Sequence, residues 1–107
     1  MTKIVAITAC IAGIAHTYMA AANLKKYAKK EGDEIKVETQ GAMGIENKLS
    51  SQDIKDADVV IFAVDTSISG KERFVGKKVL KIGTSEVIKD GDSAIKKAED
   101  LVNGKKQ

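Results

Sequence analysis

Four short apolar runs, separated by stretches of mixed polar and apolar residues, constrain the fold of this 107-residue chain more than any other feature. The runs cover residues 3–9, 34–40, 58–64 and 78–83. Between the first two runs, apolar side chains recur at the spacing of one buried helical stripe: Ala20, Leu24, Tyr27 and Ala28. Strands that alternate with helices in this way build βαβ units around a parallel sheet.

The predicted fold is a three-layer α/β/α domain with an open four-stranded parallel sheet, of the Rossmann-like or flavodoxin-like kind. Residues 58–64 form the most apolar run and are expected in a central strand. Residues 34–40 alternate apolar and charged side chains, so they are expected in an edge strand, followed by a loop with Gly41 and Gly44.

Helices are expected between the strands and at the end of the chain. The first covers about residues 16–30, the second begins at Ser50 or Ser51 and runs to 57, and a terminal helical region begins at Thr84 or Asp92. The loop 65–76 has room for one helical turn. The domain is expected to span residues 1–104, with a short tail at 105–107.

The composition excludes several classes of function. Hydrophobic residues make up 43% and charged residues 31%, as in globular domains, and no apolar run is long enough for a membrane span. The net charge of +3 is spread over interleaved acids and bases, and four aromatic residues are too few for a base-stacking platform. We therefore expect neither nucleic-acid binding nor direct membrane insertion.

Tyr18 and Met19 are expected in the core.

One cysteine, Cys10, is the strongest chemical signal. A single cysteine cannot form an intramolecular disulfide, which favours a reducing, cytoplasmic compartment. It lies in the loop that joins the first strand to the first helix, where backbone N–H groups and the helix N-terminus can surround an anion. Gly13 supplies backbone conformations that other residues disfavour. The same amides would lower the pKa of the thiol below its usual value of about 8.5 and make it a nucleophile for phosphorus.

The spacing around Cys10 leaves several functions open. Phosphotyrosine-type phosphatases have a cysteine, five residues, an arginine and then Ser or Thr, whereas here His16 and Thr17 follow the five residues. Histidine lacks the bidentate charge of arginine, so a phosphocysteine carrier is favoured over a small cysteine-dependent phosphatase or an arsenate-reductase-like enzyme. An inert buried cysteine is the structural alternative for Cys10, and helix capping or packing is the alternative for His16 and Thr17.

A non-catalytic phosphate-binding signalling module is a further alternative. Asp65 ends the third predicted strand, as in receiver domains that are phosphorylated on aspartate. Those domains also need an acidic pair after the first strand, where this chain has Thr8, Ala9 and Cys10. Asp65 is therefore interpreted as a turn residue.

The segment around Cys10 resembles the fructose-family IIB component of the bacterial sugar phosphotransferase system. The family pattern is Cys-Pro-Thr-Gly-Ile-Ala-His-Thr-Phe/Tyr-Met-Ala-Ala, and this chain has Cys-Ile-Ala-Gly-Ile-Ala-His-Thr-Tyr-Met-Ala-Ala at residues 10–21. Further matches are Val37 to Gly41 with Gly44, Asp53 and Ile54, Ala57 to Ile61, Ala63, Asp65, and Arg73, Phe74, Gly76 and Lys77. The resemblance covers residues 2–104.

The resemblance implies a role for each part of the site. Cys10 would accept a phosphoryl group from a phosphohistidine on a IIA domain and pass it to a sugar, fructose or a related hexose, bound by the membrane permease IIC. Phosphate-binding residues would be Ile11, Ala12, Gly13, Ile14, Ala15, His16 and Thr17. The domain would act at the inner face of the cell membrane, without a metal or another cofactor.

Two further points concern individual residues. Ile11 and Ala12 replace the family's Pro and Thr, which removes a preset φ angle and a hydroxyl from the loop. Arg73, the only arginine in the chain, is a candidate for docking an anionic partner, with a structural salt bridge as the alternative.

Overall fold

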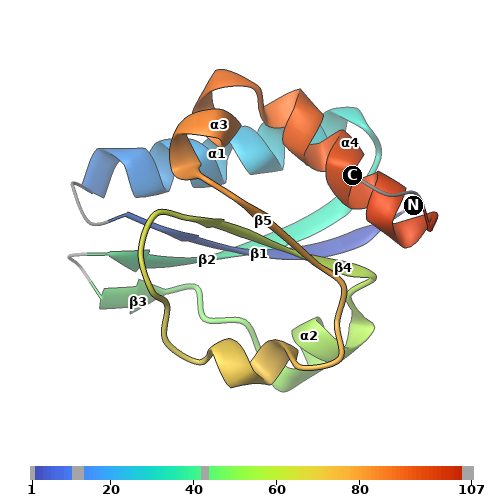
Figure 1. The fold of residues 1–107 in the computed structure, drawn as a ribbon, viewed down its shortest axis with the longest axis horizontal. Helices are drawn as coiled ribbons and strands as arrows, with labels where there is room; N and C mark the ends of the chain where they lie inside the picture. The colour runs from blue at the N-terminus through green and yellow to red at the C-terminus, as the bar shows by residue number, and fades with distance from the viewer. Residues whose placement is uncertain (1, 11–13, 42–43, 105–107) are drawn as a thin grey trace.

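The computed structural model describes residues 2–10, 14–41 and 44–104, and within this part a five-stranded sheet lies between two layers of helices (Figure 1). In chain order, the elements are β1 (Lys3–Ala9), α1 (Ile14–Lys30), β2 (Glu34–Gly41), β3 (Gly44–Glu46), α2 (Ser51–Asp56), β4 (Val59–Val64), the 3₁₀ helix η1 (Lys71–Phe74), β5 (Val79–Ile82), α3 (Thr84–Lys89) and α4 (Gly91–Val102).

The sheet has the strand order β3-β2-β1-β4-β5, and the pairs β1–β2, β1–β4 and β4–β5 are parallel. The predicted open parallel α/β architecture is therefore confirmed. The fifth strand, β3, pairs antiparallel with the end of β2 and occupies the sheet edge that was predicted for residues 34–40. Expecting only a loop at Gly41 and Gly44 was wrong, because Gly44, with a φ of +86°, lets the chain reverse into a hairpin.

Each face of the sheet has its own hydrophobic core. Successive residues of β1 alternate between them, so that Ile4 packs toward α1, α3 and α4, whereas Val5 packs toward α2 and η1. Figure 1 shows these two helical layers above and below the sheet. Residues 59–63 of β4 are all buried, as expected for a central strand.

The helix ends follow local capping chemistry. Ser50 caps α2, where its hydroxyl accepts a hydrogen bond from the Asp53 N–H at 3.0 Å and its own N–H donates to the Asp53 carboxylate at 3.0 Å. The terminal region contains two helices, α3 from Thr84 and α4 from Gly91, so both predicted starts mark a helix. Helix α1 begins at Ile14, slightly before the predicted start.

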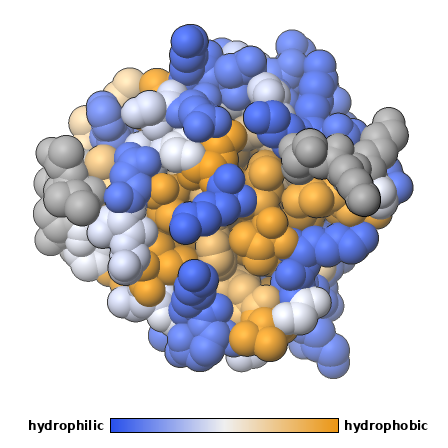
Figure 2. Space-filling view, in the orientation of Figure 1, coloured by the Kyte–Doolittle hydropathy of each residue, from blue (hydrophilic) through white to orange (hydrophobic). Residues whose placement is uncertain are grey.

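The face crossed by β5 has apolar side chains on its surface. Figure 2 shows apolar side chains at the centre of this face, interrupted by hydrophilic ones. Val75 and Val79 are exposed there, next to the buried ring of Phe74. The Phe74 ring packs edge-on against Phe62 with a centroid distance of 5.2 Å, which ties η1 to the sheet.

Candidate functional site

Cys10 lies at the point of the sheet where the connections change direction. The preceding residue, Ala9, pairs with Gln40 of β2 on one side and Val64 of β4 on the other. Cys10 therefore leaves the carboxyl end of β1 between two other strand ends, which is where open α/β sheets bind their ligands. Its thiol is free and half-buried.

The loops that follow β1, β2 and β4 meet beside Cys10. The Asp65 N–H donates to the Ala9 carbonyl oxygen at 3.0 Å. Gln40 exchanges two hydrogen bonds with the backbone of Ser69, accepting from its N–H at 2.8 Å and donating to its carbonyl at 3.0 Å. These contacts join the ends of β1, β2 and β4 into one polar edge.

Helix α1 points its N-terminus toward this edge. It is 17 residues long and begins at Ile14, with no acidic residue in its first turn. The unpaired N–H groups and the positive end of the helix dipole favour an anion near that turn. Ile11, Ala12 and Gly13, predicted to bind phosphate through their amides, lie outside the described residues, and their role stays a prediction.

Asp65 lies at the end of the strand next to that of Cys10. Thr84 binds its carboxylate twice, through the N–H at 3.1 Å and through the hydroxyl. The Thr84 hydroxyl, the Thr84 N–H, the Cys10 thiol and the imidazole of His16 together hold the pKa of Asp65 below its ordinary value, against the opposite effect of partial burial. The structure therefore brings Cys10, His16 and Asp65 together.

The two polar residues of the α1 first turn differ in accessibility. His16 is exposed, as is Ala15, whereas Thr17 is only 1% exposed. The Thr17 hydroxyl has no hydrogen-bond partner within the described chain, and a Cβ added to Gly41 would lie 3.9 Å from it. Thr17 therefore lies against the end of β2, and the roles predicted for Thr17 and His16 toward phosphate stay predictions.

Two apolar side chains near the start of α1 are exposed. Tyr18 is 39% exposed and Met19 is 50% exposed, so the expectation that both belong to the core was wrong. They lie on α1 outside the buried stripe that contains Ala20 and Leu24. Tyr18 donates a hydrogen bond to Glu46 of β3, which connects the first turns of α1 to the β2–β3 hairpin.

Arg73 takes part in a buried ion pair. Its Nη1 and Nη2 donate to the two carboxylate oxygens of Glu38 at 3.0 Å each, and the Glu38 side chain is fully buried in β2. Burial alone would raise the pKa of Glu38, but hydrogen bonds from Arg73, Gln40 and the Leu49 N–H outweigh it and lower that pKa. Docking of a partner by Arg73 stays a prediction. The guanidinium that would dock the partner is already bound by Glu38.

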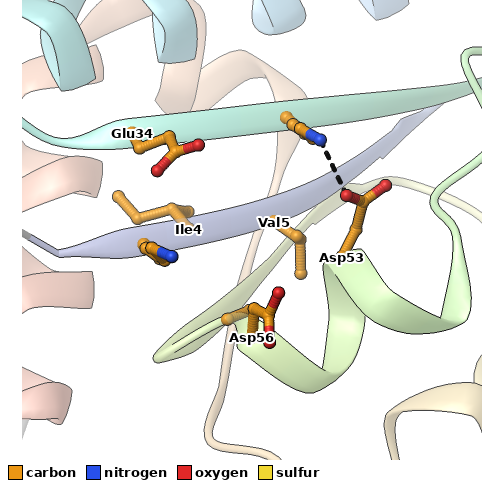
Figure 3. Close-up of a pocket in the computed structure, with 8 residues that line it drawn as sticks. Ile4, Val5, Glu34, Asp53 and Asp56 are labelled. Carbon is orange, nitrogen blue, oxygen red and sulfur yellow. Dashed lines mark hydrogen bonds and ion pairs between the residues drawn. The ribbon is translucent and has the colours of Figure 1, made fainter.

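Two hollows lie at opposite ends of the sheet. One of about 460 Å³ adjoins Asp65 and is lined also by Ser67, Lys71 and Lys81. The other, of about 80 Å³, lies at the amino ends of β1 and β2, between Ile4, Val5, Glu34, Asp53 and Asp56 (Figure 3). The dashed contact in Figure 3 is the 2.7 Å ion pair of Lys36 with Asp53. Only the first hollow lies at the edge that holds Cys10.

Comparison with known protein families identifies the chain. The matching family model is described as the lactose/cellobiose-specific IIB subunit of the phosphotransferase system, PTS, and it covers residues 5–97. The chain belongs to the PTS IIB family. Within the part of this IIB chain that the structure describes, no group of three or more His, Cys, Asp or Glu residues could hold a metal ion.

The relatives place this IIB chain in the fructose-like group of phosphotransferase components. The fructose-like EIIB component 2 of Escherichia coli K12 is 48% identical over 99 residues, which cover 92% of this chain and 93% of that relative. The fructose-specific EIIABC component of Bacillus subtilis is 50% identical over 96 residues, 90% of this chain but 15% of that relative.

A solved structure agrees with this placement. A domain of the fructose-specific IIABC component of Borrelia burgdorferi superposes with a TM-score of 0.86 and 50% identity, over 91% of this chain and 92% of that domain. In the described part of this IIB chain, no helix has both the length and the apolar character that a membrane crossing requires.

The sequence analysis missed two acidic residues of this IIB site. Asp65 was interpreted as a turn residue; it does lie at a bend, but its carboxylate is turned to Thr84 and Cys10. Its position at the end of a strand beside β1 is the signal that could have identified it. Glu38 was counted among the charged residues of an edge strand, although its burial and its pairing with Arg73 stabilise the neighbouring loop.

Proposed function

We propose that Cys10 carries the phosphoryl group in this fructose-like IIB component. The observation that carries the proposal is a half-buried, free thiol at the carboxyl end of β1, four residues before α1 begins at Ile14. This position offers a nucleophile to an incoming phosphorus atom and favourable backbone dipoles to the phosphate oxygens.

The proposed reaction has two transfers. The Cys10 sulfur attacks the phosphorus of a phosphohistidine on a IIA domain, so that an S–P bond forms, the N–P bond breaks and the released imidazole takes up a proton. A sugar hydroxyl then attacks the phosphocysteine, and the sulfur leaves as a thiol. The N–H groups of residues 11–16 bind the phosphate oxygens, and His16 and Thr17 assist by hydrogen bonds to the phosphate or the thiolate.

The proposed partners follow from the arrangement of relatives. IIA and IIC are fused with IIB in the EIIABC relative of Bacillus subtilis, of which this chain covers 15%. We infer that this chain receives phosphate from a IIA domain and delivers it to fructose or a related hexose bound by a membrane IIC permease. The domain, residues 1–104, would then work in the cytoplasm at the inner face of the membrane, with 105–107 as a tail.

A phosphatase function has less support from the geometry. Cysteine-dependent phosphatases clamp the phosphate with an arginine, because a guanidinium binds two oxygens at once. The only arginine of this chain is Arg73, and its guanidinium is bound to Glu38, Gly70 and Ser69. A carrier needs no such clamp, since its phosphocysteine must persist until an acceptor arrives.

Labelling with phosphate tests the proposal. A phosphorylated IIA domain should transfer one phosphoryl group to the wild-type chain, and reagents that cleave S–P bonds should release it. Cys10→Ser should abolish stable labelling, because the chain has no other thiol. The label is followed by intact-protein mass spectrometry.

His16 provides the matched control, since it is the only histidine of the chain. His16→Asn should still be labelled on Cys10. A label that persists in Cys10→Ser and disappears in His16→Asn would show a phosphohistidine and contradict the proposal. Rapid hydrolysis of a generic aryl phosphate would favour the phosphatase instead.

A further inference from the structure

Asp65 lies directly beside Cys10, at the carboxyl ends of two neighbouring strands. Ala9 and Val64 are register partners in β1 and β4, and the Asp65 N–H donates to the Ala9 carbonyl oxygen at 3.0 Å. Cys10 and Asp65, which follow these partners, therefore leave the sheet side by side, on neighbouring strand ends. The two transfers proposed above leave this carboxylate without a role.

Thr84 fixes the orientation of the Asp65 carboxylate. Its N–H donates to Oδ1 at 3.1 Å and its hydroxyl donates to Oδ2, while the threonine itself is fully buried at the start of α3. Gly83 permits this approach, because a Cβ there would lie 3.2 Å from Oδ1. Thr84 thus binds both carboxylate oxygens of Asp65 from the side of β5. The other side of the carboxylate stays open to Cys10.

The surroundings keep Asp65 ionised. The groups that face it are hydrogen-bond donors or cations: Thr84, Cys10 and His16, with Lys71 and Lys81 lining the same hollow. Thr84 first, and then Cys10 and His16, hold the pKa of Asp65 below its ordinary value. A charged acceptor is therefore present beside the thiol throughout the physiological pH range.

We propose that Asp65 is a catalytic residue that relays the Cys10 thiol proton, an inference that rests on the proposed function. As the sulfur attacks phosphorus, the S–H proton passes to Asp65, the S–P bond forms and the donor's N–P bond breaks. The proton then moves to the released imidazole nitrogen. In the second transfer, the proton of the sugar hydroxyl passes through Asp65 to the departing sulfur while the S–P bond breaks.

The relay agrees with the charge and the position of the carboxylate. An ionised carboxylate beside the thiol can take up its proton as the S–P bond forms and pass it to the released imidazole, whose ordinary pKa is higher.

Two rates measured on Asp65→Asn test the relay. The variant keeps the shape of the side chain and an acceptor for the Thr84 N–H, but it removes the charge. We expect phosphoryl transfer from a phosphorylated IIA domain to fall about 100-fold, within the range for general acid–base groups. Alkylation of Cys10 by the neutral reagent iodoacetamide should instead become faster at a given pH, because no neighbouring negative charge then opposes the thiolate.

Three further variants serve as controls. Asp92→Asn makes the same change in an α4 carboxylate whose partner is Lys96, at 3.0 Å, and should leave both rates unchanged. Thr84→Val keeps the Asp65 charge and loses only one hydrogen bond, so transfer should fall less than in Asp65→Asn. Asp65→Glu should retain more transfer than Asp65→Asn, because it keeps a carboxylate.

The outcomes separate the relay from the function on which it rests. Wild-type transfer rates in Asp65→Asn, or alkylation that slows together with transfer, would overturn the relay. Equal losses in Asp65→Glu and Asp65→Asn would overturn it as well. A wild-type chain that takes no label on Cys10 would overturn the carrier function itself.

Discussion

Two carboxylates flank β1 at the same end of the sheet, and their surroundings differ completely. Glu38, on β2, is fully buried and accepts hydrogen bonds from Arg73, Gln40 and the Leu49 N–H. Asp65, at the end of β4, is exposed and is bound by Thr84 from one side. Hydrogen bonds lower the pKa of both carboxyls, yet only Asp65 keeps a side open to the thiol.

The difference indicates that the Glu38 carboxylate stabilises the fold, whereas the Asp65 carboxylate is available for chemistry. A buried charge must have its hydrogen-bonding capacity filled by the protein, because an unfilled one costs several kcal/mol. Glu38 is satisfied in this way and braces the loop between β4 and η1 through Arg73 and Gln40. The same hydrogen bonds hold the segment that begins with Asp65. The buried surroundings of Glu38 therefore help to position the exposed Asp65.

Removing the ion pair of Arg73 with Glu38 should produce the largest effect on stability. Arg73→Met leaves Glu38 buried without its cation, and we expect the free energy of unfolding to fall by about 3 kcal/mol. Urea unfolding measures the loss. Asp65→Asn, by contrast, should change stability much less, because that side chain is exposed.

The exposed ion pair of Lys36 with Asp53 is the matched control. Its N–O distance of 2.7 Å is shorter than that of Arg73 with Glu38, but the Lys36 side chain is 58% exposed. Lys36→Met should therefore cause a change too small to resolve. Glu38→Leu in the Arg73→Met background should restore part of the lost stability. Equal losses in Arg73→Met and Lys36→Met would show that burial does not distinguish the two pairs.

Gly70 lies in the loop between β4 and η1 and tests how tightly Arg73 is held against Glu38. It has a φ of +73°, and a Cβ there would lie 2.5 Å from Nε of Arg73. Gly32 has a similar φ of +77° with open space around it. Both alanine variants should lose about 1 kcal/mol from backbone strain, and Gly70→Ala should lose about 1 kcal/mol more, because Arg73 must move away from Glu38.

Thermal or urea unfolding of Gly70→Ala and Gly32→Ala measures this difference. Identical losses would mean that Arg73 adjusts without disturbing Glu38, and the brace would then be looser than its distances indicate.

The sequence was sufficient for the architecture, because strand and helix periodicities are local properties. The four parallel strands and the helices between them follow from residue spacing alone. Strand β3 could not be predicted in this way, since three residues, 44–46, are too few to show an alternating pattern. Tyr18 was assigned to the core from its apolar character, whereas its position on α1 places it outside the stripe of Ala20 and Leu24.

The candidate site could be predicted only where it is continuous in the chain. Cys10, His16 and Thr17 belong to one loop and helix start, so a motif identifies them. Asp65 is separated from Cys10 by β2, β3 and α2 in the sequence, and its role depends on β4 lying next to β1. Glu38 alternates with Val37 and Thr39 like an exposed residue, and only the packing of η1 and residue 49 reveals its burial.

A third carboxylate arrangement, at the other end of the sheet, joins two acidic side chains and should behave in the opposite way. When Glu99 of α4 is protonated, it can donate a hydrogen bond to Asp33, whose Oδ1 accepts from the Thr2 N–H at 3.1 Å and whose Oδ2 has no partner among the described residues. The hydrogen bond and the negative charge of Asp33, with a contribution from burial, raise the pKa of Glu99 from 4.5 to about 7. Glu31 and Asp100 act in the same direction.

This pair predicts a pH dependence with a defined sign, smaller than the effects above. The folded chain binds the Glu99 proton more tightly than the unfolded chain, so the contribution is complete below pH 4.5 and is lost as the pH rises to about 7. Glu99→Gln cannot ionise, and its stability relative to the wild type should rise between about pH 5 and about pH 8. Glu86→Gln, an exposed α3 position, should show a constant difference over that range. A constant difference for Glu99→Gln as well would mean that Asp33 does not raise the pKa of Glu99.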